Sequence, residues 1–149
     1  RIKKVINGEV DGIILAAAGI KRLGLEEKIS SYMGIKKWIP AIGQGAIGIE
    51  TKKNNKEIND LIYKLNHKET SLCVNAERQI SKFFEASCST PIAANAIIQD
   101  NIIEISSMIG SLDGKKTIYY QEKGLIENYE KVGFECAAGL ESKGARELL

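Results

Sequence analysis

The second half of the chain contains three strand-like runs whose connections are too short for anything but antiparallel pairing. The runs "IAANAIIQ", "NIIEISSMIG" and "KTIYYQE" are rich in isoleucine and tyrosine, which favour extended backbone. Turn residues lie between them, Gln99-Asp100-Asn101 after the first run and Asp113-Gly114 after the second. Parallel strands need a crossover of a dozen or more residues, so this pattern predicts a small antiparallel sheet of about three strands.

Helix-like segments flank these three runs. Before them comes "KETSLCVNAERQISKFFEA", and after them come "LIENYEKVGFECAAGLES" and the possible helix start "KGARELL". The first segment has its candidate apolar face at Leu72, Ala76, Ile80, Phe83 and Phe84. Residues 67–149 are therefore predicted to form an α+β domain, in which helices cover the antiparallel sheet.

The beginning of the chain has a different pattern. "RIKKVINGE" is typical of the last turns of a helix, and "VDGIILA" is a continuous apolar run typical of a buried strand in a parallel sheet. Two helix-like segments follow, "AAGIKRLG" closed by Gly24 and "LEEKISSYM" closed by Gly34. A strand followed by helix indicates the α/β class for this part.

A glycine-rich segment, "WIPAIGQGAIGIE", separates the two parts. Gly43, Gly45 and Gly48 satisfy G-x-G-x-x-G, but a dinucleotide site requires a helix directly afterwards, and "AIGIETKK" alternates like a strand. We therefore reject a nucleotide site. Pro40 stiffens the entry and the first two glycines permit unusual backbone angles, which suits a hinge between domains. Gln44 would offer a polar group to a cleft, and "NKEINDLIYKLNH" continues as an amphipathic helix.

Charge and cysteine usage limit the possible partners. The formal net charge is +2, so nothing calls for nucleic acid or a membrane surface, and the longest apolar run, "GIILAAAGI", is too short to span a bilayer. Three cysteines without close pairing fit a reducing cytoplasm better than a disulfide framework. With no Cys-x-x-Cys and one histidine, we expect no metal site.

The three cysteines differ in context. Cys73 and Cys136 lie within helix-like segments and are expected to be small buried hydrophobic residues. Cys88 lies in the loop-like stretch "ASCSTP", where a structural thiol is unusual. A thiolate is a strong, soft nucleophile, so Cys88 is the candidate for covalent chemistry.

Four stretches, "NGEVDGIILAAAGIKRLGL", "PAIGQGAIGIE", "LNHKETSLCVNAER" and "ASCSTPIAANA", resemble the porphobilinogen deaminase (hydroxymethylbilane synthase) family, C-terminal half only. The resemblance implies a transferase of haem and tetrapyrrole biosynthesis. Such an enzyme joins porphobilinogen units, releases ammonia at each step and yields the linear tetrapyrrole hydroxymethylbilane. It also implies a dipyrromethane cofactor held by Cys88 through a thioether, since Cys88 stands where that family has its cofactor cysteine.

The resemblance also assigns the cationic residues. Arg1 and Arg22 match arginines that the family uses to bind the acetate and propionate groups of cofactor and substrate, and Gln44 is expected to bind substrate. For Arg22 a second interpretation stays open, a cation offsetting the dipole at a helix C-terminus. Lys21 is expected to be a solvated neighbour. Glu77 and Arg78 are expected to be structural partners in the cofactor-carrying domain.

The family layout predicts three regions. Residues 1–39 would be the later part of a doubly wound second α/β domain, and 40–66 the hinge with a segment returning to the first domain. Residues 67–149 would be the cofactor-carrying domain. The family's catalytic aspartate belongs to an N-terminal half that the chain would need as its partner. No catalytic residue is therefore assigned in this fragment, and Asp11 and Asp60 are expected to be structural.

The chain departs from the family near the cysteine. Ala86 and Ser87 stand where two glycines are common, and Ala93 replaces a further glycine. A β-carbon at a left-handed position would cost about 1–2 kcal/mol.

Two other functions stay open at this point. One is a non-catalytic module that binds carboxylate ligands or a partner, and the weaker one is a thiol-redox role without a nearby resolving cysteine. The family suggests a monomer.

Overall fold

The computed structural model describes residues 1–35 and 37–149, and these form two compact units, Arg1–Met33 and Gly34–Leu149. Each unit is considered by itself. The domain limits at 39/40 and 66/67 concern a longer family protein and stay predictions. Among the described residues, no helix is long and apolar enough to cross a membrane.

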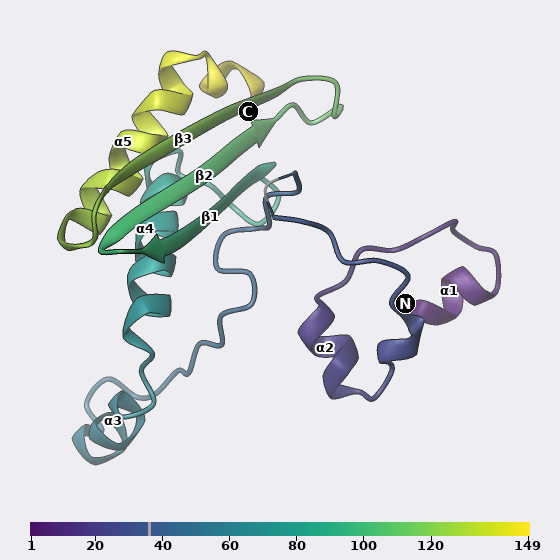
Figure 1. Ribbon diagram of the computed structural model, residues 1–149, viewed down its shortest axis with the longest axis horizontal. Helices are drawn as coiled ribbons and strands as arrows, with labels where there is room; N and C mark the ends of the chain where they lie inside the picture. The colour runs from purple at the N-terminus through teal and green to yellow at the C-terminus, as the bar shows by residue number, and fades with distance from the viewer. Residues whose placement is uncertain (36) are drawn as a thin grey trace. The chain divides into compact units, whose positions relative to one another are not determined.

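The larger unit is built on one antiparallel sheet of three strands, β1 (Ile92–Gln99), β2 (Ile102–Gly110) and β3 (Thr117–Leu125). They lie in the order β1-β2-β3 with short connections (Figure 1). Asp100 and Asn101, between β1 and β2, both have positive φ, as tight hairpin turns require. The predicted antiparallel α+β domain is confirmed.

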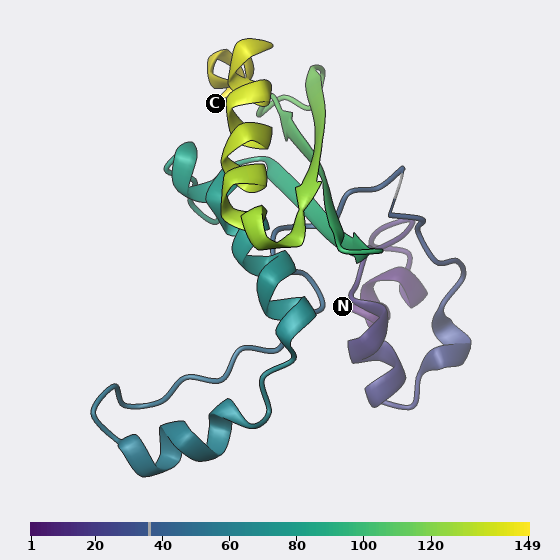
Figure 2. The ribbon, with the colours of Figure 1, turned by 60° about the vertical axis from the view of Figure 1, so that its left-hand side comes forward.

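Two helices, α4 (Lys68–Phe83) and α5 (Tyr129–Ser142), cover one face of this sheet (Figures 1 and 2). Alternate residues of each strand point toward them, so that Ala94 and Ser107, paired across β1 and β2, are both fully buried. A β-carbon on Gly133 of α5 would lie 2.2 Å from the Ala76 carbonyl oxygen of α4, so the helices cross in close contact there. The 3₁₀ turns η2 (Ile126–Asn128) and η3 (Ala145–Leu148) precede and follow α5.

The smaller unit contains α1 (Ile2–Ile6), α2 (Ala17–Arg22) and the 3₁₀ turn η1 (Glu26–Lys28). The strand predicted over residues 10–16 is absent from the described structure, and Ile14 is 74% exposed. A strand needs a neighbour to pair its backbone groups, and within residues 1–33 there is none. The helix predicted over 25–33 is reduced to η1, because so short a helix is marginal without a buried face.

The segment between the glycine-rich loop and the sheet contains α3 (Lys56–Tyr63), as predicted. It begins where the Asn55 side chain accepts a hydrogen bond from the Ile58 N–H at 3.3 Å. The strand-like alternation over residues 46–53 does not produce a strand, and Ile47 is 87% exposed. The sequence pattern therefore predicted the helix correctly, whereas the strand that it indicated over residues 46–53 is not formed.

Candidate cofactor-attachment site

Cys88 lies in the loop that joins α4 to β1, and its side chain is exposed. The loop is closed by two hydrogen bonds between the same pair of residues. The Thr90 N–H donates to the Ser87 carbonyl oxygen at 3.1 Å, and the Ser87 N–H donates to Thr90 Oγ1 at 2.9 Å. The Ser87 and Ser89 hydroxyls lie 2.9 Å apart. The thiol is thus presented to solvent from a turn whose backbone is held on both sides.

The residues that replace the family glycines do not carry backbone strain. Ala86 and Ser87 both have negative φ, so the cost expected for a β-carbon at a left-handed position does not arise there. Glu85 takes the left-handed conformation instead, with φ 51°, directly after the α4 C-cap. The Ala86 N–H then returns to the Ser81 carbonyl oxygen at 2.8 Å, as in a Schellman-type helix end.

The end of α4 that precedes this loop rests on an aromatic cluster that sequence reasoning missed. The Phe83 ring packs edge-on against Phe84 and Phe134, with centroids 5.1 and 5.3 Å away. Arg146 of η3 lies 5.4 Å from the Phe84 ring centre, and its Nη2 donates to the Phe83 carbonyl oxygen at 3.4 Å. No short-range signal connects Arg146 to a helix end 63 residues earlier.

The other two cysteines have environments that suppress their reactivity. Cys136 is fully buried with its sulfur 3.0 Å from Ser107 Oγ, and burial raises its pKa to about 11. Burial also raises the pKa of the half-buried Cys73 thiol, and the negative charges of Glu77 and Glu69 add to that shift. Complete burial, as predicted, is thus found for Cys136 only. Cys88 is the cysteine that a bulky ligand can reach.

The predicted anion-binding arginines lie in the smaller unit. Arg1 is the N-cap of α1 and Arg22 is the last residue of α2, and both are exposed. Lys21 is exposed, as predicted, and its Nζ pairs with Glu26 at 3.0 Å and lies 5.3 Å from the Tyr32 ring centre. Because Cys88 belongs to the other unit, joint action of the arginines with Cys88 on one ligand stays a prediction.

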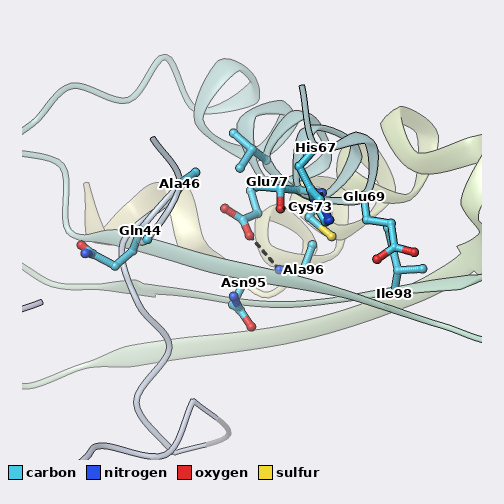
Figure 3. A pocket seen from close by; sticks show the side chains of 12 residues that line it. Gln44, Ala46, His67, Glu69, Cys73, Glu77, Asn95, Ala96 and Ile98 are labelled. Carbon is cyan, nitrogen blue, oxygen red and sulfur yellow. Dashed lines mark hydrogen bonds between the residues drawn. The ribbon is translucent and has the colours of Figure 1, made fainter. Parts of the chain in front are cut away.

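The glycine-rich loop, residues 40–46, has the unusual backbone that the sequence predicted. Gly43 and Gly45 have φ of 72° and 87°, and turns are closed by hydrogen bonds from the Gln44 N–H to the Ala41 carbonyl and from the Ala46 N–H to the Gly43 carbonyl. Gln44 is exposed at the tip. It borders a groove of about 350 Å³ whose other walls come from α4 and β1 (Figure 3). Whether Pro40 and the two glycines act as a hinge stays a prediction.

Glu77, expected to be structural, is buried beneath this groove and is only 4% exposed. Its Oε2 accepts a hydrogen bond from the Gly43 N–H at 2.7 Å, and its Oε1 accepts one from the Ala96 N–H at 2.8 Å. Burial raises the pKa of this carboxyl, and the two hydrogen bonds offset part of that rise. The structural role is confirmed, while its neighbour Arg78 is exposed.

The remaining carboxylates form no metal-binding group in the part of the chain that the structure describes. No group of three or more histidine, cysteine, aspartate or glutamate side chains is placed to hold a metal ion there. Asp11 and Asp60 are both exposed. The candidate site therefore consists of one accessible thiol on a held turn.

Comparisons with known proteins identify the family of this arrangement. A family model described as "Porphobilinogen deaminase, dipyromethane cofactor binding domain" matches residues 1–60, and one described as "Porphobilinogen deaminase, C-terminal domain" matches residues 71–142. Cys88 lies within the second match.

Relatives named porphobilinogen deaminase align with the whole chain. The protein from Coxiella burnetii (strain Dugway 5J108-111) is 43% identical over 149 residues, which are 100% of this chain and 48% of the relative. Those from Alkaliphilus metalliredigens and Carboxydothermus hydrogenoformans are 41% and 39% identical over the same 149 residues, covering 47% and 48% of their lengths. The chain spans about half the length of the relatives it matches.

Proposed function

Because the chain belongs to the porphobilinogen deaminase family, we propose that Cys88 carries a dipyrromethane cofactor through a thioether. The proposal is supported by the exposed Cys88 side chain on a hydrogen-bonded turn, whereas the other two cysteines are buried or half-buried. Thioether formation needs an accessible sulfur and room beyond it, and only an exposed loop supplies both. The residues present therefore fit the cofactor.

Attachment follows from the chemistry of the thiol. When an aminomethyl pyrrole loses ammonia, its methylene carbon becomes electrophilic. The Cys88 sulfur supplies the electron pair of the new carbon–sulfur bond, and the thiol proton leaves with the ammonia. A dipyrromethane held by Cys88 would supply the pyrrole carbon to which the next porphobilinogen is joined. The surrounding turn keeps the sulfur in one place on the domain during this process.

The basic and hinge residues complete the proposal. Arg1 and Arg22 would bind the carboxylates of the cofactor and of the growing pyrrole chain by paired, charge-assisted hydrogen bonds. Gln44 would bind substrate at the tip of the glycine-rich loop. Pro40, Gly43 and Gly45 would form the connection between domains of the longer protein.

The parent protein is proposed to make hydroxymethylbilane from porphobilinogen, as a monomer in the cytoplasm. The family resemblance places the catalytic aspartate in an N-terminal half that this chain does not include, so we expect the 149-residue chain alone to show no turnover. Its partner would be the N-terminal half of the same protein.

The test is ammonia release from porphobilinogen by the full-length parent protein and its Cys88→Ser and Cys73→Ser variants. We expect the first substitution to abolish release and the second to leave most of it. A carboxylate-binding module would instead bind porphobilinogen equally well in all three proteins and release no ammonia. That result would replace the deaminase proposal with the binding one.

A further inference from the structure

The carboxylate of Glu77 joins three segments that are far apart in the sequence. It lies on α4, and its two oxygens accept hydrogen bonds from the Gly43 N–H, 34 residues earlier, and from the Ala96 N–H of β1, 19 residues later. Figure 3 shows the side chain between the glycine-rich loop and the strand, with the bond to Ala96 drawn. The Glu77 side chain thus connects the glycine-rich loop to β1 through two hydrogen bonds.

A carboxylate is a costly side chain to bury, and its position indicates a specific use. An ionised group held 4% exposed loses most of its hydration, and only hydrogen bonds offset that loss. Each Glu77 oxygen has a backbone donor, and both donors are main-chain groups of connecting or edge segments. The link therefore depends on the path of the backbone at residue 43 and not on a second side chain.

The loop is shaped to present that backbone N–H. Gly43 has φ 72°, a conformation that residues with a β-carbon rarely adopt, and its N–H lies 2.7 Å from Glu77 Oε2. The preceding Ile42 side chain packs against the hydrophobic core of the sheet domain. Gln44 follows at the exposed tip. The left-handed conformation of Gly43 thus helps to attach the loop to Glu77. A flexible hinge would instead require a backbone that is free to change its dihedral angles.

We propose that Glu77 is a positioning residue that fixes the glycine-rich loop to the domain carrying Cys88, so that the loop and the cofactor-bearing domain move as one body. The inference rests on the proposed function for its consequence, namely that Gln44 keeps a constant place relative to Cys88. Bending between domains then occurs before Ala41 or after Ala46. Gly43 and Gly45 then belong to the part that does not bend, which narrows the proposed hinge to Pro40 and the segments that flank the loop.

The direct test is amide hydrogen exchange in the full chain, resolved by residue with NMR. In the Glu77→Gln variant, the side-chain oxygen can accept from one N–H, but the amide group meets the other N–H donor to donor. We expect exchange at Gly43 to accelerate at least ten-fold, while amides in the middle of β2, such as those of Ile105 and Ser107, stay within two-fold of the wild type.

The matched control is Glu69→Gln, which alters an exposed glutamate on the same helix and at the same groove. It should leave Gly43 exchange unchanged. Gly43→Ala disturbs the link from the loop side, because alanine is strained at φ 72°, and should accelerate exchange at Ala96, whose N–H donates to the other oxygen of Glu77. Unchanged exchange at both amides in both link variants would overturn the inference, as would equal acceleration across β2, which would show a general loss of stability.

A separate measurement distinguishes this inference from the proposed function. In the full-length parent protein, Glu77→Gln should keep the cofactor adduct on Cys88 and lower kcat for ammonia release several-fold with a smaller change in KM. An unmodified Cys88 in the wild type would contradict the proposed function and leave the exchange result standing. An intact adduct with unchanged exchange would contradict only the positioning role.

Discussion

The reactivity of each cysteine is determined by its immediate surroundings. Cys136 is enclosed by the helices and the sheet, and its pKa of about 11 keeps it protonated at neutral pH. Cys88 has the same side chain, but it lies on an exposed turn held by Ser87 and Thr90. Access to solvent therefore distinguishes a structural thiol from a candidate nucleophile. Two glutamates likewise differ in their surroundings, because Glu85 is exposed and Glu77 is buried.

The backbone conformation of Glu85 is expected to lower the stability of the folded chain. Glu85 adopts φ 51° at the position after the helix C-cap, where glycine is the usual residue. Glu85→Gly should raise the free energy of unfolding by about 0.5–1 kcal/mol, since relief of left-handed strain exceeds the entropy cost of glycine. Urea unfolding measures the change. Ala86→Gly, at an ordinary φ, is the control and should lower stability by about 0.5–1 kcal/mol.

Glu77 should make the stability of the larger unit depend on pH. Burial raises its folded pKa above the ordinary 4.5, so ionisation is less favourable in the folded chain than in the unfolded one. Its contribution is therefore fully present below about pH 4.5 and is lost as the pH rises through the raised value. The unfolding free energy of the wild type minus that of Glu77→Gln should therefore fall over that interval. A difference that grows with pH would contradict the assignment, and Glu69→Gln serves as the control.

At the scale of elements, local pattern predicted the structure wherever an element finds its partner nearby in the chain. The three strands pair through short turns, and α4 and α5 each have an apolar stripe that the sheet covers. The apolar run 10–16 does not form a strand, because its pairing partner is not supplied by residues 1–33. Turn positions such as Gly43 were predictable, since glycine is the residue that tolerates positive φ.

The candidate site was only partly predictable from the sequence. Cys88 was recognisable by its loop context, whereas its hydrogen-bonded turn depends on side-chain geometry at Ser87 and Thr90. Glu77 offered one signal, because it stands at the helical spacing of the apolar stripe between Cys73 and Ile80. Its two partners come from distant segments, so the link itself could not be read from that spacing.

The crossing of α4 and α5 depends on a glycine. A β-carbon on Gly133 would lie 2.2 Å from the Ala76 carbonyl oxygen, so Gly133→Ala must push the helices apart. We expect a loss of about 1–3 kcal/mol in unfolding free energy, measured by urea titration with circular dichroism. Glu135→Ala, at an exposed position of the same helix, should change stability by less than about 0.5 kcal/mol. Equal effects of the two substitutions would show that the helices do not approach closely at residue 133.

At the scale of the whole molecule, the chain contains the proposed attachment site and spans about half the length of the relatives it matches. The larger unit, Gly34–Leu149, has its own core and holds Cys88 on its surface. The two arginines proposed to bind the carboxylates of cofactor and substrate, Arg1 and Arg22, lie in the smaller unit, Arg1–Met33. Under the proposed function, catalysis is expected to require these units and the N-terminal half together, whereas cofactor attachment is expected to require the larger unit and its thiol.

Attachment of the cofactor to Cys88 is tested by the intact mass of the purified full-length parent protein beside its Cys88→Ser variant. We predict an excess mass equal to two linked pyrroles in the wild type. That excess should disappear in Cys88→Ser, remain in Cys73→Ser, and map to the peptide that contains Cys88. An unmodified wild-type mass, or an adduct that persists in Cys88→Ser, would contradict the claim.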